Sequence, residues 1–188
     1  MKILLSVIGT LVVLFLIGLI TMYSGIVNVS ALERPSGMTR WILSSTRESS
    51  IESRIDDIQV PNLDDSTMIN EGAEHYAHMC RGCHGAPGYE DTELAKSLEP
   101  RAPHLSMARR ADHFNAAESF WVTKNGIMMT GMPAWGRTHS DEKIWDIVAF
   151  LKKLPQLTPE QYSKLTNASK GESMEEHEHE ESMETGHN

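Results

Sequence analysis

Cysteine is scarce in this chain of 188 residues, and its scarcity excludes several kinds of small protein. The only two cysteines, Cys80 and Cys83, stand three residues apart, so at most one disulfide can form within the chain. A zinc site with four protein ligands would need more sulfur, or several histidines gathered from elsewhere. Runs of alternating β-branched residues and internal repeats are also missing, which leaves an all-α domain as the expected fold.

Basic residues are fewer than acidic ones in this chain. Seventeen lysines and arginines face 26 aspartates and glutamates, for a formal net charge of −9 at pH 7. Seven of the glutamates follow Gly171, where no lysine or arginine occurs, so the rest of the chain carries only −2. No strongly basic face is expected, which argues against a nucleic acid as partner.

The first thirty residues hold a long apolar run. Residues Ile3 to Ile20 carry no charged side chain, and this is long enough to cross a bilayer as a helix. It exceeds the roughly 7–15 apolar residues of a signal peptide, although Val29-Ser30-Ala31 offers a cleavage site for that alternative. We therefore expect residues 1–32 to be a transmembrane anchor or an uncleaved signal. The rest of the chain would face the outside of the membrane, where cysteines are readily oxidised.

The remaining chain divides into three expected regions. Residues 33–65 mix serine, charge and proline, and are expected to form a linker with one amphipathic turn around residues 51–58. As a flexible coil it would separate its ends by on the order of 30 Å. Residues 66–157 are the expected compact domain. Residues 158–188 are expected to be an acidic tail, rich in histidine and glutamate and disordered.

Helical spacing of apolar residues recurs within residues 66–157. A first helix is predicted to begin near Asp65 and to run into the cysteines, and a short one to cover residues 92–98. Another is predicted over residues 112–124, ending at Asn125-Gly126. The clearest follows Ser140 and ends before Pro155.

The two cysteines form one motif with the histidine that follows them. On a helix Cys80, Cys83 and His84 share a face. The two thiols can each add to a vinyl group of a haem lying against that face, and the imidazole then points at the iron. A disulfide or a thioredoxin-like redox pair is the alternative, but neither needs the histidine. The motif predicts one covalent haem c, with His84 as an axial ligand.

A sixth iron ligand is expected from the segment "NGIMMTGMPAWG". Met132 is bracketed by a glycine, which permits close backbone approach, and by a proline, which fixes the chain. We predict Met132 as the second axial ligand and expect Met128 and Met129 to pack in the core. The histidines that would compete for the iron are His104, His113 and His139. His75 and His78 lie too close to the motif to reach the other face of the ring.

Taken together, Cys80-Arg81-Gly82-Cys83-His84 and Gly131-Met132-Pro133-Ala134-Trp135 resemble a monohaem class I cytochrome c, and more narrowly the c-type domains of haem–copper oxidase subunit III. The resemblance covers residues 66–157. It implies a small class I cytochrome c fold around one haem, in which a proline carbonyl orients the proximal imidazole. Pro103 is the candidate for that proline, with Pro87 as the rival.

The ligand set and the resemblance imply an electron carrier rather than an enzyme. The resemblance does not extend to the anchor, the linker or the tail, and it is the apolar N-terminal run that leads us to expect a tether to the bacterial inner membrane with the domain in the periplasm. It would exchange electrons with redox proteins of a respiratory or dehydrogenase chain. The alternative is a haem peroxidase or gas sensor with a displaceable sixth ligand. Some further side chains would contact the haem or line a docking face, although core or surface roles are commoner: Tyr76, Trp121, Trp135, Trp145, Arg101, Arg109, Arg110, Lys124 and Arg137. His177, His179, Met183 and His187 would bind a metal if the tail has that role.

Overall fold

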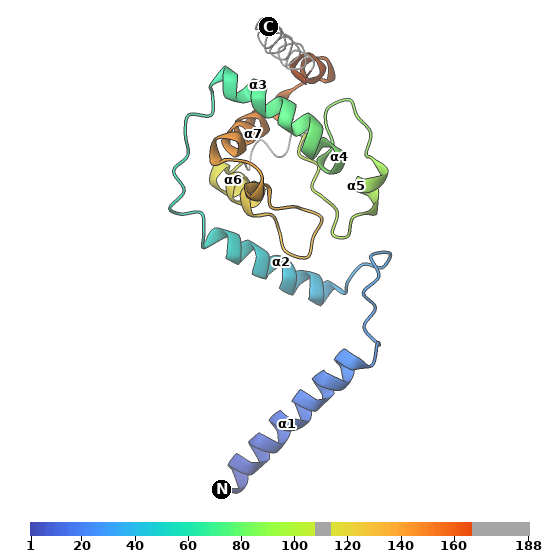
Figure 1. Ribbon diagram of the computed structural model, residues 1–188. Helices are drawn as coiled ribbons and strands as arrows, with labels where there is room; N and C mark the ends of the chain where they lie inside the picture. The colour runs from blue at the N-terminus through green and yellow to red at the C-terminus, as the bar shows by residue number, and fades with distance from the viewer. Residues whose placement is uncertain (108–113, 167–188) are drawn as a thin grey trace, which may run out of the picture. The chain divides into compact units, whose positions relative to one another are not determined.

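The computed structural model describes residues 1–107 and 114–166, and this part of the chain is helical (Figure 1). Its only β-type pairing is an isolated bridge between Ala86 and Tyr89. The chain divides into two units, one over Met1–Pro35 and the other from Ser36 onward. The all-α expectation is confirmed.

The first unit contains α1, Lys2–Tyr23. This helix has the length and the composition needed to cross a membrane, with a mean hydropathy of 3.0 over its most apolar window. A signal sequence has the same properties. The expected apolar N-terminal helix is therefore confirmed, and both of its interpretations stay open.

The second unit is built on the crossing of α3, Ser66–His75, with α7, Asp141–Lys153. Each helix begins at a side-chain cap: Asp65 accepts hydrogen bonds from two amides of α3, and Ser140 accepts one from α7. The helices approach closely at Gly72, where a Cβ atom would overlap the carbonyl oxygen of Asp146. Both predicted helices are confirmed.

Helix α6, Ala116–Asn125, packs against the other side of α7. Asn115 caps it and Gly126 ends it, with a φ of 66°. The predicted end is confirmed, and α6 begins at Ala116, because the Asn115 side chain accepts from the amide of Glu118. Residues 112 and 113, where the helix was predicted to begin, lie outside the described part of the chain. The short α5, Glu93–Ser97, is capped by Thr92 and agrees with the prediction.

Residues 33–65 differ from the prediction of a flexible coil. They contain α2, Gly37–Glu52, which Ser36 caps by accepting from the amide of Thr39. Near its end Ile51 is buried, and α2 packs against α6. The coil prediction is wrong for these sixteen residues, since tertiary packing on the domain stabilises a helix that local patterning did not indicate.

The beginning of the predicted disordered tail is also ordered. Residues 159–166 are helical and follow Thr158, whose hydroxyl accepts from the amide of Gln161 while the Gln161 side chain accepts from the amide of Thr158. Tyr162 is fully buried with Phe150 and Tyr76 in a hydrophobic cluster. The compact part therefore continues to at least residue 166, and residues 167–188 lie outside the described part of the chain.

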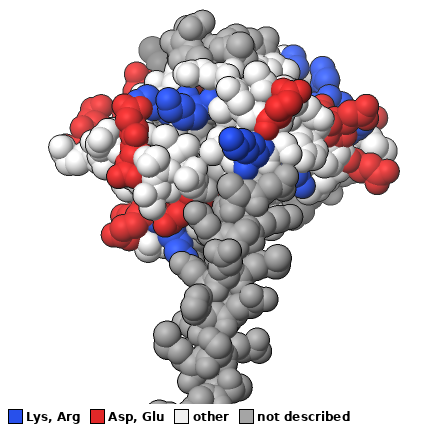
Figure 2. All heavy atoms as spheres, turned by 90° about the horizontal axis from the view of Figure 1, so that it is seen from above, with Lys and Arg blue, Asp and Glu red and all other residues white. Residues whose placement is uncertain are grey.

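Charged side chains of both signs are mixed on the face seen from above in Figure 2. Two ion pairs tie helices to their neighbours: Lys152 Nζ lies 2.9 Å from Asp64 Oδ1, and Lys124 Nζ lies 2.6 Å from Asp141 Oδ1. Both pairs are partly exposed, so solvent screens them and they contribute little to stability. The fold is therefore held chiefly by the apolar contacts of α3, α6 and α7.

Candidate functional site

A cavity of about 500 Å³ lies between α2, α6, the end of α7 and the loops that follow the cysteine motif. Three of the four residues predicted as haem-binding line it, namely Cys83, His84 and Met132. The volume falls within the roughly 300–1,000 Å³ of small-molecule and cofactor sites. The fold thus brings together residues that are about fifty positions apart in the sequence.

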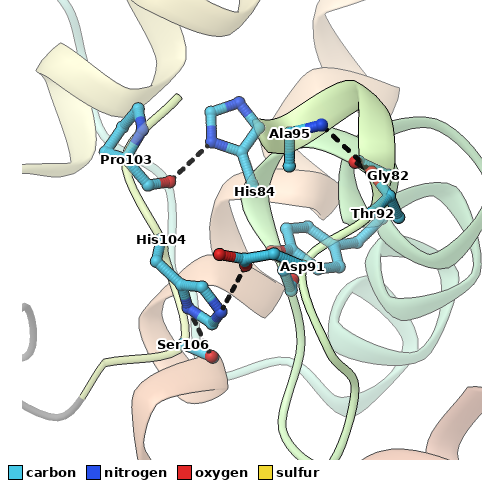
Figure 3. A network of polar contacts seen from close by, with 10 residues as sticks. Gly82, His84, Asp91, Thr92, Ala95, Pro103, His104 and Ser106 are labelled. Atoms are coloured by element: carbon cyan, nitrogen blue, oxygen red, sulfur yellow. Dashed lines mark hydrogen bonds and ion pairs between the residues drawn. The ribbon is translucent and has the colours of Figure 1, made fainter. Parts of the chain in front are cut away.

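His84 is held by the loop that crosses below it (Figure 3). Its Nδ1 lies 2.9 Å from the carbonyl oxygen of Pro103, and its own carbonyl accepts from the amide of Leu105 at 3.0 Å. A carbonyl oxygen only accepts, so Nδ1 carries the proton and Nε2 is the basic nitrogen of the neutral ring. This confirms Pro103, rather than Pro87, as the proline whose carbonyl orients the imidazole.

The cysteines occupy different environments. Cys80 is buried in the cluster that contains Tyr76 and Phe150, whereas Cys83 is half-buried and lines the cavity. Burial, with a smaller effect of Cys83, raises the pKa of the Cys80 thiol to about 12. A reactive dithiol requires a lowered pKa, so this environment argues against the thioredoxin-like alternative.

The helix that leads into the motif is not uniform. Residues Tyr76–Cys80 form a π-helical turn between α3 and α4, Arg81–His84. The predicted continuous α-helix is therefore corrected at this turn, which carries one residue more than an α-helical turn would and changes the direction of the side chains after it. The Tyr76 hydroxyl donates to the Gly85 carbonyl at 2.6 Å, fixing the end of the motif against the core.

The side chain of Thr92 also holds the cysteine motif. The Thr92 hydroxyl donates to the carbonyl of Gly82 and accepts from the amide of Ala95 at 3.1 Å (Figure 3). The same side chain therefore caps α5 and anchors the middle of the motif. Sequence reasoning identified Thr92 as the start of a short helix but missed this link, which only the fold creates.

Met132 sits in a loop that is fixed at several points. Its carbonyl accepts from the amide of Ile127 at 3.2 Å, and its amide donates to the Thr130 hydroxyl at 3.1 Å. Gly126 packs directly under this backbone, and a Cβ atom on Gly131 would lie 2.7 Å from Leu98. Gly131 and Leu98 both line the cavity, so the small size of Gly131 permits this packing, and its close approach to a haem stays a prediction.

The neighbouring methionines do not pack in the core as predicted. Met128 is 91 % exposed and Met129 is 94 % exposed. They occupy the tip of the loop, where Met129 has a positive φ of 59°. The prediction that they fill the core is wrong, and neither lines the cavity.

The rival histidines lie elsewhere. His104 Nδ1 lies 3.0 Å from the Ser106 hydroxyl and its Nε2 lies 3.6 Å from Asp91 Oδ1 (Figure 3). The ring of His139 packs edge-on against the rings of His75 and Trp135. Neither histidine lines the cavity, and His113 lies outside the described residues.

Among the other candidate contacts, Arg101 lines the cavity, while Lys124 pairs with Asp141. Trp145 stacks on Phe120 in the core, as expected for the commoner role. Arg47, Glu48 and Ile51 of α2 also line the cavity, and sequence reasoning missed all three. The Ser36 cap was the one local sign of α2. The remaining candidates either do not line the cavity or lie outside the described residues, namely Tyr76, Trp121, Trp135, Arg137, Arg109, Arg110, His177, His179, Met183 and His187.

The chemistry of the cavity fits a flat apolar ring that carries a metal and acidic groups. An oriented imidazole, a thioether and a thiol come together in it. Among the described residues, Arg47 and Arg101 supply positive charge to its wall. Apolar side chains form much of the rest, including Leu98, Leu105, Val122, Ile127 and Leu151. Among the described residues no cluster of three or more histidine, cysteine or carboxylate side chains suits a bare metal ion.

Residues 67–151 match the family described as cytochrome C oxidase, cbb3-type, subunit III. Comparison with curated proteins finds no match. The matched segment contains the cysteine motif, the Pro103 loop, the Met132 loop and most of α7.

Proposed function

From the premise that residues 67–151 are a cytochrome c domain of the cbb3 oxidase subunit III type, an electron carrier with one covalent haem c, we propose how this chain holds that group. Cys80 and Cys83 would attach the haem through two thioether bonds, and His84 and Met132 would bind its iron. The observation that best supports this proposal is that His84 and Met132 line one cavity while the Pro103 carbonyl orients the imidazole. When bound, the haem supplies one-electron chemistry at its iron.

Each residue has a distinct part in this proposal. Pro103 holds the proton on Nδ1 of His84, so that Nε2 is the coordinating atom. Met132 supplies a sulfur ligand, which raises the reduction potential relative to a second imidazole. With His84 and Met132 both supplied by the chain, the iron would have no free position for a substrate, and electron transfer would need little rearrangement of the protein.

Helix α1 supports a tether to the membrane. Its length and apolar composition suit a single span, with the cytochrome domain on the periplasmic side of the bacterial inner membrane. A tethered domain would pass electrons between membrane-associated redox proteins of a respiratory or dehydrogenase chain. Washing isolated membranes at high pH separates the alternatives, since a retained anchor keeps the protein in the membrane and a cleaved signal releases it.

The ligand set is tested by optical spectra of the purified holoprotein. Met132→Ala should abolish the sulfur-to-iron charge-transfer band of the oxidised form. Met129→Ala is the matched control, because that side chain is 94 % exposed on the same loop, and it should keep the band. Loss of the band in neither variant would exclude Met132 as a ligand.

Two further measurements address the attachment and the alternative function. Covalent haem stays with the polypeptide in acidified organic solvent, and Cys80→Ala with Cys83→Ala should release it. Carbon monoxide should bind the reduced wild-type protein slowly or incompletely at neutral pH. Rapid, stoichiometric binding would overturn the carrier proposal in favour of a gas sensor or peroxidase.

A further inference from the structure

Helix α2 lies outside the matched segment of residues 67–151, yet it forms part of the cavity wall. Three of its side chains, Arg47, Glu48 and Ile51, line the cavity together with His84 and Met132. On a helix, residues 47, 48 and 51 share one face. One face of the last turns of α2 is therefore directed at the cavity.

Ile51 shows that this face is packed rather than loosely apposed. It is 6 % exposed and is the buried residue of α2. It belongs to neither of the two hydrophobic clusters that form the core in the described part of the chain. It lines the cavity, and α2 packs against α6, so Ile51 contributes apolar surface to the cavity wall.

Polar side chains of two neighbouring helices also line the cavity. Helix α2 packs against α6, and Asn115, Glu118 and Ser119 at the start of α6 join Arg47 and Glu48 in the lining. Val122 of α6 and Ile51 of α2 add apolar surface to the same lining. A haem combines the same two characters, because its ring is apolar and its two propionates are carboxylates.

Arg47 is able to take a new partner. Within the described residues its ion pair is with the adjacent Glu48, at 3.2 Å, and the side chains are 41 % and 67 % exposed. An exposed pair of this kind contributes little stability, so it opposes a competing carboxylate only weakly. The planar guanidinium of arginine binds carboxylates through two parallel hydrogen bonds, which lysine cannot reproduce.

Resting on the proposed haem site, the geometry points to Arg47 as the side chain that binds a haem propionate, which makes α2 a part of that site. Among the described residues of the lining Arg101 is the other arginine, and Glu48 and Glu118 are its carboxylates, so an arginine is the group there that attracts a propionate. Arg47 then acts through the haem as a positioning residue. It also sets the potential, because a cation beside the haem disfavours the extra positive charge of the ferric state.

The test compares variants of the full-length holoprotein by midpoint potential and by resonance Raman spectra. Arg47→Gln should lower the ratio of reduced to oxidised protein at fixed potential by about threefold, equivalent to about 28 mV for one electron. It should also shift the propionate bending bands. Arg40→Gln is the matched control, since Arg40 is exposed on the same helix and does not line the cavity.

Two more variants separate direct binding from a general effect of charge. Arg47→Lys keeps the charge and should restore most of the potential, but not the Raman bands, because the two-bond contact is lost. Glu48→Gln removes the competing carboxylate and should raise the potential. Raman bands of Arg47→Gln that match those of Arg40→Gln would overturn the inference, whatever the potential.

Failure of this inference is distinguishable from failure of the proposed function. A wild-type protein that carries no covalent haem would refute the proposed function. The role of Arg47 alone would be refuted if the wild-type protein has covalent haem and an intact sulfur-to-iron band while Arg47→Gln and Arg40→Gln give the same potential and Raman spectra. Equal thermal unfolding of the two variants shows that both have folded.

Discussion

Replacing Gly126 by alanine should weaken the placement of Met132 without touching any proposed ligand. Gly126 ends α6 with a φ of 66° and a ψ of −171°, and its amide donates to the carbonyl of Val122 at 2.8 Å. A Cβ atom there would lie 2.7 Å from the Pro133 carbonyl carbon and 2.8 Å from the Met132 oxygen. These are backbone atoms, so the loop itself has to move.

Two costs add in this variant. The backbone conformation of Gly126 belongs almost solely to glycine, and a side chain there costs of order 1–3 kcal/mol. Forcing a methyl group into a packed site costs about 1–3 kcal/mol more. A shift of the Met132 loop relieves part of the total of roughly 2–6 kcal/mol. Such a shift lengthens the hydrogen bond from the Ile127 amide to the Met132 carbonyl, which is 3.2 Å in the structure.

The assay follows the sulfur-to-iron band of the oxidised holoprotein while it is heated. In Gly126→Ala the band should be weaker at room temperature and should disappear well below global unfolding, which circular dichroism reports. Gly37→Ala is the control, because a Cβ atom at Gly37 would have no neighbour within 4 Å. A band in Gly126→Ala as strong and as heat-resistant as in Gly37→Ala would refute the packing argument.

Three further predictions concern stability, measured by chemical denaturation of the holoprotein. Burial and the neighbouring Glu71 raise the pKa of Asp146 from 3.8 to about 6, so the folded protein holds this proton more tightly than the unfolded chain does, and stability falls as the pH rises from about 4 to about 6. Asp146→Asn should flatten this pH dependence and should be more stable than the wild type at pH 7, and an unchanged slope would contradict the argument. Gly72→Ala should lower the free energy of unfolding by at least about 3 kcal/mol, because α3 and α7 have to separate. Gly82→Ala, where a Cβ atom has no neighbour within 4 Å, should cost much less, and equal costs would refute the close crossing. Tyr162→Ala should cost about 3–5 kcal/mol, as truncation of a buried aromatic does, and a cost near zero would show that residues 159–166 do not pack on the core.

The parts of the structure that the sequence predicted are those with strong local patterns. Asp65 and Ser140 are side-chain caps, and α7 carries an apolar stripe, so the beginnings of α3 and α7 could be predicted directly. The cysteine motif and the Gly-Met-Pro segment depend on spacing and chemistry alone. Pro103 required the family resemblance, because nothing local distinguishes its carbonyl from that of Pro87.

The misassigned parts depend on tertiary contacts. Helix α2 leaves Met38, Trp41 and Ile42 exposed, so its apolar pattern does not indicate the face that packs, which is marked by Ile51 alone. Residues 159–166 looked polar because a single aromatic, Tyr162, supplies their deepest burial. The π-helical turn before Arg81 has no established sequence rule, and it was therefore predicted as α-helix.

The contribution of α2 also predicts what the matched segment lacks by itself. Residues 67–151 contain every residue proposed to attach or ligate the haem, whereas one wall of the cavity comes from Arg47, Glu48 and Ile51. Deleting residues 37–52 should therefore leave covalent haem in place but open that wall to water. Solvent stabilises the more highly charged ferric state, so the midpoint potential should fall further than in Arg47→Gln, which loses the cation but keeps Ile51. A deletion variant with the potential of the wild type would show that the cavity is complete without α2.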